Sequence, residues 1–198
     1  MTDELQLINA AKAGSADAFA DLVRSYRTRL LRFLLTRCSS FADAEDVLQD
    51  TMIAAYRYLH SYDPRWRFST WLYRIAIRNA QKMRSENIVE IGELSDEESD
   101  PLLHCIAHSE TENLWVSARR VLNDDVFAAT WLRYAEDMSI SDISKALDRS
   151  DSWTKVNLLR ARKALDTEMN HKNNGYKCDG KSYHIDVIVG HIKNRVQE

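Results

Sequence analysis

Apolar residues recur every three or four positions along the first part of the chain, the spacing of one face of an α-helix. Residues 3–12 predict a short helix that ends before Gly14, and Ser15 can cap a second helix. The apolar positions of the second helix are Phe19, Leu22, Val23, Tyr26, Leu30, Phe33 and Leu34. The chain therefore begins with two amphipathic helices.

The same period restarts at residues 39–62. The stripe expected to be buried there is Val47, Leu48, Met52, Ala55, Tyr56 and Leu59. Pro64 interrupts the pattern, and Ser69 or Thr70 is expected to cap a fourth helix. Its inward positions are Leu72, Ile75, Ala76 and Met83. Residues 1–85 thus predict a compact bundle of about four helices.

Residues 86–110 lose the helical period and carry an acidic run, which indicates a flexible linker. The period returns over residues 111–169. This segment contains a short helix capped at Ser139, a turn at 148–151 and a longer basic helix that begins at Ser152. A short helix, a tight turn and a longer helix form the helix-turn-helix arrangement.

Residues 170–198 have a different character. Asp179 and Gly180 form a turn signal, and the residues after them alternate between apolar and polar, so a small hairpin is possible there. The predicted fold class is all-α: two small helical domains, joined by the acidic linker and followed by a short C-terminal extension of unknown role.

Composition supports the helical interpretation. The chain has 198 residues, enough for one domain or two small ones, with only 5 Gly and 2 Pro, which disfavours an all-β fold rich in turns. No apolar run approaches the roughly 20 residues that span a bilayer, so no membrane insertion is expected. Cys38, Cys105 and Cys178 are far apart and odd in number, which fits a reducing cytoplasm.

The formal net charge of −3 hides a strong segregation of charge. Residues 57–85 hold seven basic residues and one acidic residue, a net charge of +6. Residues 86–112 hold nine acidic residues and no Lys or Arg, and residues 145–163 have a net charge of +4. Two basic segments therefore flank an acidic one, and local fields of this kind steer charged partners more than the net charge does.

The first basic segment also carries aromatic residues. Tyr62, Trp66, Phe68, Trp71 and Tyr73 lie among Arg65, Arg67, Arg74 and Arg78. Single-stranded nucleic acid is bound in this way, because cations follow the phosphates while aromatic rings stack on unpaired bases. The competing interpretation is that the aromatics belong to the core. We expect burial for Phe68 and Trp71, and exposure for Tyr62 and Trp66.

Two further surfaces stand out. Asp46, Gln49 and Asp50 share one polar stripe of the third helix, which suits a basic protein partner or is simply a solvated face. The basic helix of the helix-turn-helix segment carries, apart from its apolar side, the residues Ser152, Trp153, Lys155, Val156, Asn157, Arg160 and Lys163. Its expected apolar side is Leu158, Leu159, Ala161 and Leu165. We interpret this helix as a DNA major-groove reader rather than an ordinary amphipathic helix.

The sequence offers little for an enzyme. It contains no phosphate-binding glycine loop, no Gly-x-Ser-x-Gly and no His-Glu-x-x-His, and a di-iron bundle would need a second Glu-x-x-His besides Glu168 to His171. Four tail residues, His171, Cys178, His184 and His191, lack the spacing typical of a zinc site. No catalytic residue, metal or cofactor is therefore predicted.

Together these segments resemble a known family. Residues 18–34, the stretch from "DAEDVLQD" to "YRIAIRNA" at 43–80, and residues 122–165 are similar in order and pattern to the bacterial RNA polymerase sigma factors of the extracytoplasmic-function (ECF) group. The resemblance covers most of residues 15–167. It implies a protein that is not an enzyme, that binds core RNA polymerase and that promotes promoter opening for transcription initiation.

The resemblance also implies roles for individual residues. Asp46, Gln49 and Asp50 fall on positions that bind the β′ clamp helices of the polymerase. The −10 DNA-binding set is Tyr62, Arg65, Trp66, Arg67, Phe68, Trp71, Arg74 and Arg78. The −35 DNA-binding set is Ser152, Trp153, Lys155, Asn157 and Arg160. Residues 1–85 correspond to sigma domain two, and residues 111–169 to sigma domain four.

The partners implied are core RNA polymerase, through its β′ and β subunits, promoter DNA and an anti-sigma factor. Two departures affect base preference: Arg78 stands where many relatives have Asn, with Asn79 one place later, and Trp153 and Asn157 alter the recognition helix. The second hypothesis is a helix-turn-helix transcription regulator that acts without polymerase. It leaves the Asp46 stripe and the aromatic loop unexplained.

Overall fold

The computed structural model describes residues 4–90 and 110–173, and all of the regular secondary structure in these ranges is helical. The prediction of an all-α fold is confirmed for these ranges. The chain divides into two compact units, residues 1–101 and 102–198. The predicted hairpin, most of the acidic linker and the chain from residue 174 onward lie outside the described residues.

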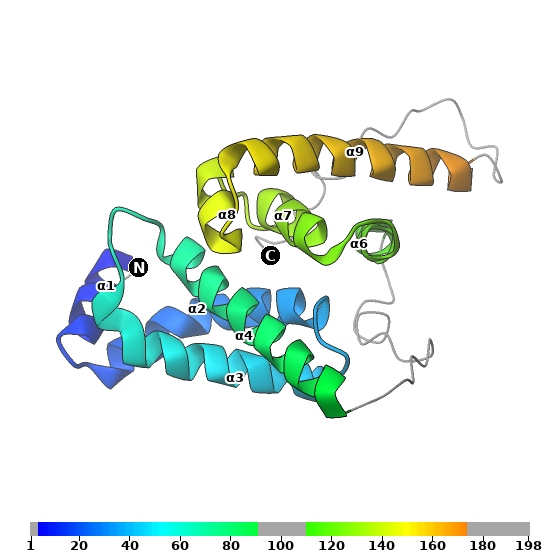
Figure 1. The fold of residues 1–198 in the computed structure, drawn as a ribbon. Helices are drawn as coiled ribbons and strands as arrows, with labels where there is room; N and C mark the ends of the chain where they lie inside the picture. The colour runs from blue at the N-terminus through cyan, green and yellow to red at the C-terminus, as the bar shows by residue number, and fades with distance from the viewer. Residues whose placement is uncertain (1–3, 91–109, 174–198) are drawn as a thin grey trace. The chain divides into compact units, whose positions relative to one another are not determined.

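Over residues 4–90, the first unit is a bundle of helices (Figure 1). They are α1 (Glu4–Lys12), α2 (Ala16–Leu35), α3 (Phe41–Tyr58), the short 3₁₀ helix η1 (Leu59–Ser61) and α4 (Phe68–Glu90). Helix α1 packs against α2, and α3 packs against both α2 and α4. Helices α3 and α4 therefore lie side by side, and η1 and the loop after it connect them.

Local signals begin and end these helices as expected. Gly14 follows α1 with a φ of +101°, a backbone conformation that residues other than glycine rarely adopt. The Ser15 hydroxyl accepts a hydrogen bond from the amide of Ala18 at 3.2 Å, and Ser40 accepts one from the amide of Asp43 at 3.0 Å. Each serine satisfies a backbone donor that has no partner within its helix.

The core of the first unit joins aromatic and aliphatic side chains from α2, α3 and α4. Its largest fully buried members are Leu22, Leu30, Phe33, Leu34, Leu48, Phe68, Leu72 and Tyr73. The rings of Phe33 and Tyr73 meet edge to face, with centroids 5.3 Å apart. This contact fixes α4 against α2 and thereby the position of the loop that precedes α4.

The apolar positions predicted to be buried along α3 and into η1 are buried at four of the six sites, which are Val47, Leu48, Ala55 and Leu59. Tyr56 is 49% exposed, because it lies at the margin of the core, where one side of its ring meets Phe19 edge to face. Met52 is half-buried. Thr51 is buried and donates a hydrogen bond to the carbonyl oxygen of Val47 at 2.7 Å. A hydroxyl that is satisfied by its own helix can thus occupy a core position.

Helix α4 differs from its predicted bounds at both ends. It begins at Phe68, before the expected caps Ser69 and Thr70, because the buried Phe68 side chain anchors the first turn. It continues to Glu90, whereas the sequence pattern ends the helix at 85.

The second unit contains α6 (Glu110–Val121), α7 (Asp124–Tyr134), α8 (Ile140–Leu147) and α9 (Asp151–Asn173). Helix α9 packs against the other three. The core side chains include Trp115, Phe127, Trp131, Leu132, Met138, Ile143, Ala161 and Leu165. The rings of Trp115 and Trp131 lie 4.6 Å apart between centroids, so an aromatic pair joins α6 to α7.

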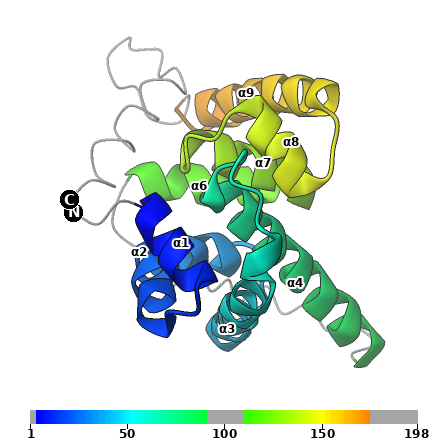
Figure 2. The same ribbon diagram turned by 90° about the vertical axis from the view of Figure 1, so that its left-hand side faces the viewer.

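Helices α8 and α9 are joined by a tight turn (Figure 2). Ser139 caps α8 by accepting a hydrogen bond from the amide of Asp142 at 3.1 Å, as predicted. Asp148 ends α8 in the left-handed conformation with φ +57°, the place where many such turns use glycine. The Ser150 hydroxyl accepts a hydrogen bond from the amide of Trp153 at 3.1 Å, which starts α9. The predicted helix-turn-helix arrangement is present.

None of the helices described over 4–90 and 110–173 is both long and apolar enough to cross a membrane.

Candidate nucleic-acid and protein interfaces

The polar stripe of α3 lies at the surface. Asp46, Gln49 and Asp50 are all exposed, while the neighbouring Val47 and Leu48 are buried. The structure therefore brings the three predicted side chains together on one face of the helix. Because all three side chains are exposed, substitutions at these positions should leave the core unchanged.

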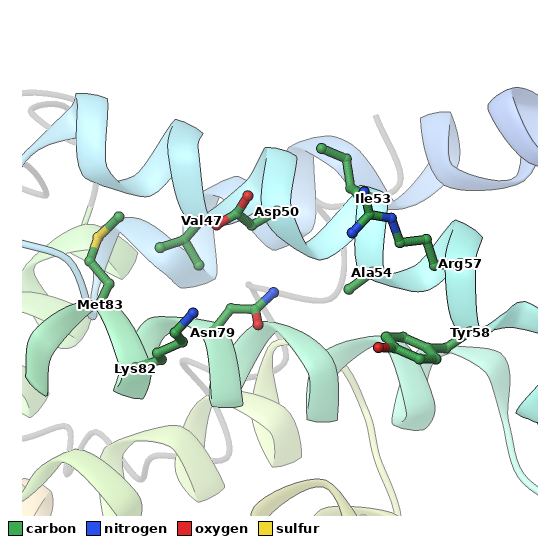
Figure 3. A pocket seen from close by; sticks show the side chains of 9 residues that line it. All are labelled: Val47, Asp50, Ile53, Ala54, Arg57, Tyr58, Asn79, Lys82 and Met83. Carbon is green, nitrogen blue, oxygen red and sulfur yellow. The ribbon is translucent and has the colours of Figure 1, made fainter. Parts of the chain in front are cut away.

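A shallow hollow of about 200 Å³ lies beside this stripe, between α3 and α4 (Figure 3). It is lined by Val47, Asp50, Ile53, Ala54, Arg57, Tyr58, Asn79, Lys82 and Met83. Ile53 and Tyr58 are exposed apolar residues at its rim. The sequence indicates that both side chains are exposed, because neither belongs to the positions that the helical period assigns to the core.

The loop from residue 62 to 67 carries the basic and aromatic residues predicted for the −10 surface. Arg65, Trp66 and Arg67 are exposed, with Trp66 at 37%. The prediction that Tyr62 is exposed is wrong, since only 5% of the residue is accessible. Its ring packs 5.4 Å from that of Phe68 and 5.6 Å from that of Trp71.

Phe68 is fully buried, as expected, whereas Trp71, for which burial was also expected, is only half-buried. Tyr26 completes the cluster, with its ring 5.6 Å from that of Phe68. The loop thus presents one exposed ring, Trp66, above an aromatic base. It is not the multi-ring platform that the sequence suggested, because four aromatic side chains pack on one another instead.

Hydrogen bonds hold this loop in one conformation. The Tyr62 hydroxyl donates to the carbonyl oxygen of Trp66 at 2.5 Å, and the Trp66 amide donates to the carbonyl oxygen of Asp63 at 3.1 Å. Arg65 donates from its backbone amide to one Asp63 oxygen at 3.0 Å and from its guanidinium to the other at 2.6 and 2.8 Å. Lys12 of α1 donates to the Tyr62 carbonyl oxygen at 2.7 Å.

The surroundings of the loop also shift the pKa of its ionisable side chains. The hydrogen bonds from Arg65 hold the pKa of Asp63 below its ordinary value. Burial, together with the nearby charge of Glu4, raises the pKa of the Tyr62 phenol. Asp63 is therefore ionised and Tyr62 neutral at physiological pH, as their roles as acceptor and donor require.

Helix α4, which follows the loop, carries further arginines. Arg78 is exposed and Arg74 is half-buried. Asn79 is turned toward α3, where its amide donates a hydrogen bond to the Thr51 hydroxyl at 3.3 Å. Arg78 is therefore the more exposed of the two side chains, while Asn79 is half-buried and lines the hollow between α3 and α4.

The predicted −35 residues lie on the first turns of α9. Ser152, Lys155 and Arg160 are exposed, whereas Trp153 and Asn157 are half-buried. The Asn157 amide donates a hydrogen bond to the carbonyl oxygen of Trp153 at 2.9 Å, so one of its donors is used within the helix.

The predicted apolar side of α9 is wrong at one position. Leu159 is 57% exposed, while the buried side of the helix contains Thr154 in addition to Leu158, Ala161 and Leu165. Thr154 is buried because its hydroxyl has partners in Ser144 and the Ser150 carbonyl.

Comparison with known proteins agrees with this geometry. The Sigma-70 region 2 family model matches residues 22–87, which contain the α3 stripe and the loop. The ECF RNA polymerase sigma-E factor of Haemophilus influenzae is 30% identical over 183 residues, covering 85% of this chain and 96% of that protein. The ECF RNA polymerase sigma factor SigW of Bacillus subtilis is 28% identical over 173 residues, covering 80% and 92%.

Two solved structures share the fold. CnrH, in complex with the cytosolic domain of CnrY, has a TM-score of 0.61 at 20% identity and covers 85% of this chain and 97% of its own. The sigma factor RpoE of Bartonella quintana, in complex with the anti-sigma factor NepR, has a TM-score of 0.60 at 18% identity and covers 77% and 96%.

The helical fold, the exposed basic loop and the helix-turn-helix segment agree with these relatives, and sigma factors as a class are transcription initiation factors rather than enzymes. The chain is a member of the ECF family of RNA polymerase sigma factors. Its function is that of an alternative sigma factor acting with RNA polymerase, and the second hypothesis, a regulator that acts without polymerase, is not favoured.

Proposed function

We propose that this sigma factor divides promoter recognition among three surfaces. Asp46, Gln49 and Asp50 of α3 bind the β′ clamp helices of core polymerase. The 62–67 loop and α4 hold the melted −10 strand, and the first turns of α9 read the −35 element. In this scheme residues 1–85 and 111–169 act as the two working domains, and residues 86–110 link them.

The observation that carries the proposal is the geometry of the loop. Trp66 is exposed between two exposed arginines, on a backbone fixed by the buried Tyr62 hydroxyl. Flipping a base out of the duplex costs a few kcal/mol, and stacking on an aromatic ring returns about 1–3 kcal/mol per base. Because the backbone that carries Trp66 is already fixed, no backbone entropy of the loop is lost when the base arrives.

Cations in and after the loop complete the −10 surface. Arg65 and Arg67 flank Trp66, and Arg78 continues the positive charge along α4. Their role is to neutralise phosphates of the separated strand. Tyr62 and Phe68 act beneath this surface as supports, since their rings are buried and cannot stack on a base.

On α9, the exposed Lys155 and Arg160 reach the phosphates, while Ser152 and Trp153 lie at the end of the helix that enters the major groove. Asn157 has a smaller role, because its amide is engaged with the Trp153 carbonyl oxygen.

Further partners follow from the same assignment. An anti-sigma factor is proposed as an inhibitor, by analogy with the Bartonella quintana RpoE complex. The β subunit of polymerase is proposed as a second contact of the core enzyme. The site of action is proposed to be the cytoplasm, where promoter DNA and polymerase meet.

Transcription from matched templates tests the loop. Trp66→Ala in reconstituted holoenzyme should reduce promoter opening about tenfold on duplex DNA, since one base-stacking contact is lost. On a template already mismatched across the −10 element the defect should be much smaller, because strand separation is bypassed. Phe41→Ala, at an exposed aromatic position of the same unit that belongs to none of the three proposed surfaces, serves as control. Equal defects on both templates would show that Trp66 does not capture a base.

A further inference from the structure

One contact network in the second unit joins α7, the turn before α9 and α9 itself. The Arg149 guanidinium lies 2.5 Å from the Asp125 carboxylate, and its central carbon lies 5.4 Å from the centre of the Trp153 ring. Asp125 is in the first turn of α7, Arg149 is in the turn and Trp153 is in the first turn of α9. The sequence pattern assigns no role to Asp125 or Arg149.

The backbone at Arg149 and at Trp153 is already fixed. The Arg149 amide donates to the Ser144 carbonyl oxygen at 2.8 Å, and the Trp153 amide donates to the Ser150 hydroxyl at 3.1 Å. Only side-chain torsions remain to be set. The contacts to Arg149 restrict these torsions for the Trp153 indole.

Arginine has the chemistry for this position. Its guanidinium is planar, so it can bond a carboxylate in its plane and lie over an aromatic face at the same time. Lysine has the same charge but offers neither the plane nor the fork. The Arg149 side chain is 48% exposed, so the stack lies at the surface where α9 is proposed to meet DNA.

We propose that Asp125 and Arg149 are positioning residues that hold Trp153 in one rotamer, so that the edge of its indole contacts the C5-methyl group of a thymine in the −35 element. This inference rests on the proposed role of α9. Thymine is the base that offers an apolar group in the major groove, and the edge of an indole is an apolar surface. The three residues together then set the base preference at one position of the promoter.

Replacing thymine by uracil removes only the methyl group and tests the contact directly. The DNA is a promoter selected with wild-type holoenzyme from a library randomised at −35, and each −35 thymine is replaced by uracil in turn. For the wild type, one replacement should weaken binding about three- to fivefold, the size of one buried methyl group. Arg149→Lys, Asp125→Asn and Trp153→Ala should each abolish this sensitivity at the same position.

Three further variants separate positioning from folding. Asp124→Asn removes the neighbouring acid, which pairs with Arg119 of α6 at 2.5 Å, and should keep the wild-type sensitivity to uracil. Trp153→Phe retains an aromatic face and should restore part of it. The double variant Arg149→Lys with Trp153→Ala should bind no worse than Trp153→Ala alone. If Asp125→Asn lowers the melting temperature so far that it unfolds, Arg149→Lys decides the question.

The outcomes distinguish this inference from the role of α9 on which it rests. Sensitivity that survives in Arg149→Lys, or the absence of any sensitive thymine in the wild type, overturns the positioning role. A double variant, Lys155→Ala with Arg160→Ala, that binds promoters as tightly as the wild type overturns the −35 assignment of α9 itself.

Discussion

The hydroxyl of Tyr62 donates a hydrogen bond to the backbone carbonyl oxygen of Trp66 at 2.5 Å. Tyr62 is buried and Trp66 is exposed, so this bond links the core of the first unit to the tip of its basic loop. A residue whose ring lies in the core thereby controls the backbone that carries the proposed base-stacking ring.

Tyr62→Phe removes this bond and keeps the ring. We expect a loss of about 0.5–1.5 kcal/mol in the free energy of unfolding, typical of one hydrogen bond, and slower promoter opening on duplex DNA. Urea unfolding and transcription assays measure the two effects. Tyr26→Phe is the matched control, because Tyr26 belongs to the same aromatic cluster but donates its hydroxyl to Glu4 of α1. Equal opening defects in both variants would contradict a specific role of the Tyr62–Trp66 bond.

The pH dependence of the loop follows from Asp63. Its pKa is lowered in the folded state by Arg65, so the pair stabilises the fold above the ordinary carboxyl pKa of about 3.9. This contribution disappears as the pH falls through the lowered value. In a carboxyl-carbon NMR titration, Arg65→Gln should raise the pKa of Asp63 toward its ordinary value. Arg67→Gln should leave it low, and a similar rise in both variants would argue against the specific pair.

Cys38 offers an independent check of burial near the end of α2. Burial, reinforced by the charge of Asp43, raises the pKa of its thiol to about 11. In a Cys105→Ser, Cys178→Ser background, iodoacetamide should modify native Cys38 about a hundredfold more slowly at pH 8 than it modifies the unfolded chain, because thiolate is scarce. The rate should rise about tenfold per pH unit up to pH 10. A plateau near pH 9 would mean that the thiol has an ordinary pKa.

The order and type of the helices were predictable because their signals are local. Ser15 and Ser139 cap α2 and α8 where the apolar period begins, and Asp148 follows the last periodic residue of α8. The shared face of Asp46, Gln49 and Asp50 was predictable for the same reason, since residues three and four apart share a face of any helix. The resemblance to sigma factors then supplied a role for surfaces whose chemistry alone is ambiguous.

The residues whose positions or roles the sequence did not predict depend on contacts with distant parts of the chain. Tyr62 is in a loop where no period applies, and it is buried by Phe68, Trp71 and a lysine fifty residues earlier in the sequence. Asp125 and Arg149 are 24 residues apart and meet only because α7 packs against α8 and α9. Tertiary packing decides such positions, and a pattern within one helix does not contain that information.

The central claim is that polymerase binding and promoter recognition reside on separate surfaces, and four variants of reconstituted protein test it. The double variant Asp46→Ala with Asp50→Ala is paired with Asp17→Ala with Asp21→Ala, which removes the same charge from exposed positions of α2. A third variant combines Lys155→Ala with Arg160→Ala on α9, and Lys163→Ala is its single-charge comparison. All of these side chains are exposed, so the fold should change by no more than about 0.5 kcal/mol per substitution.

The deciding measurement is the affinity of each variant for core polymerase. We predict that the Asp46 and Asp50 variant binds core polymerase at least about tenfold more weakly, the loss of about 1.4 kcal/mol, and impairs all promoters alike. The α2 variant and the α9 variants should bind core polymerase as the wild type does, and the α9 variants should lose only promoter affinity. Unchanged core binding by the Asp46 and Asp50 variant would contradict the assignment of the α3 stripe to polymerase.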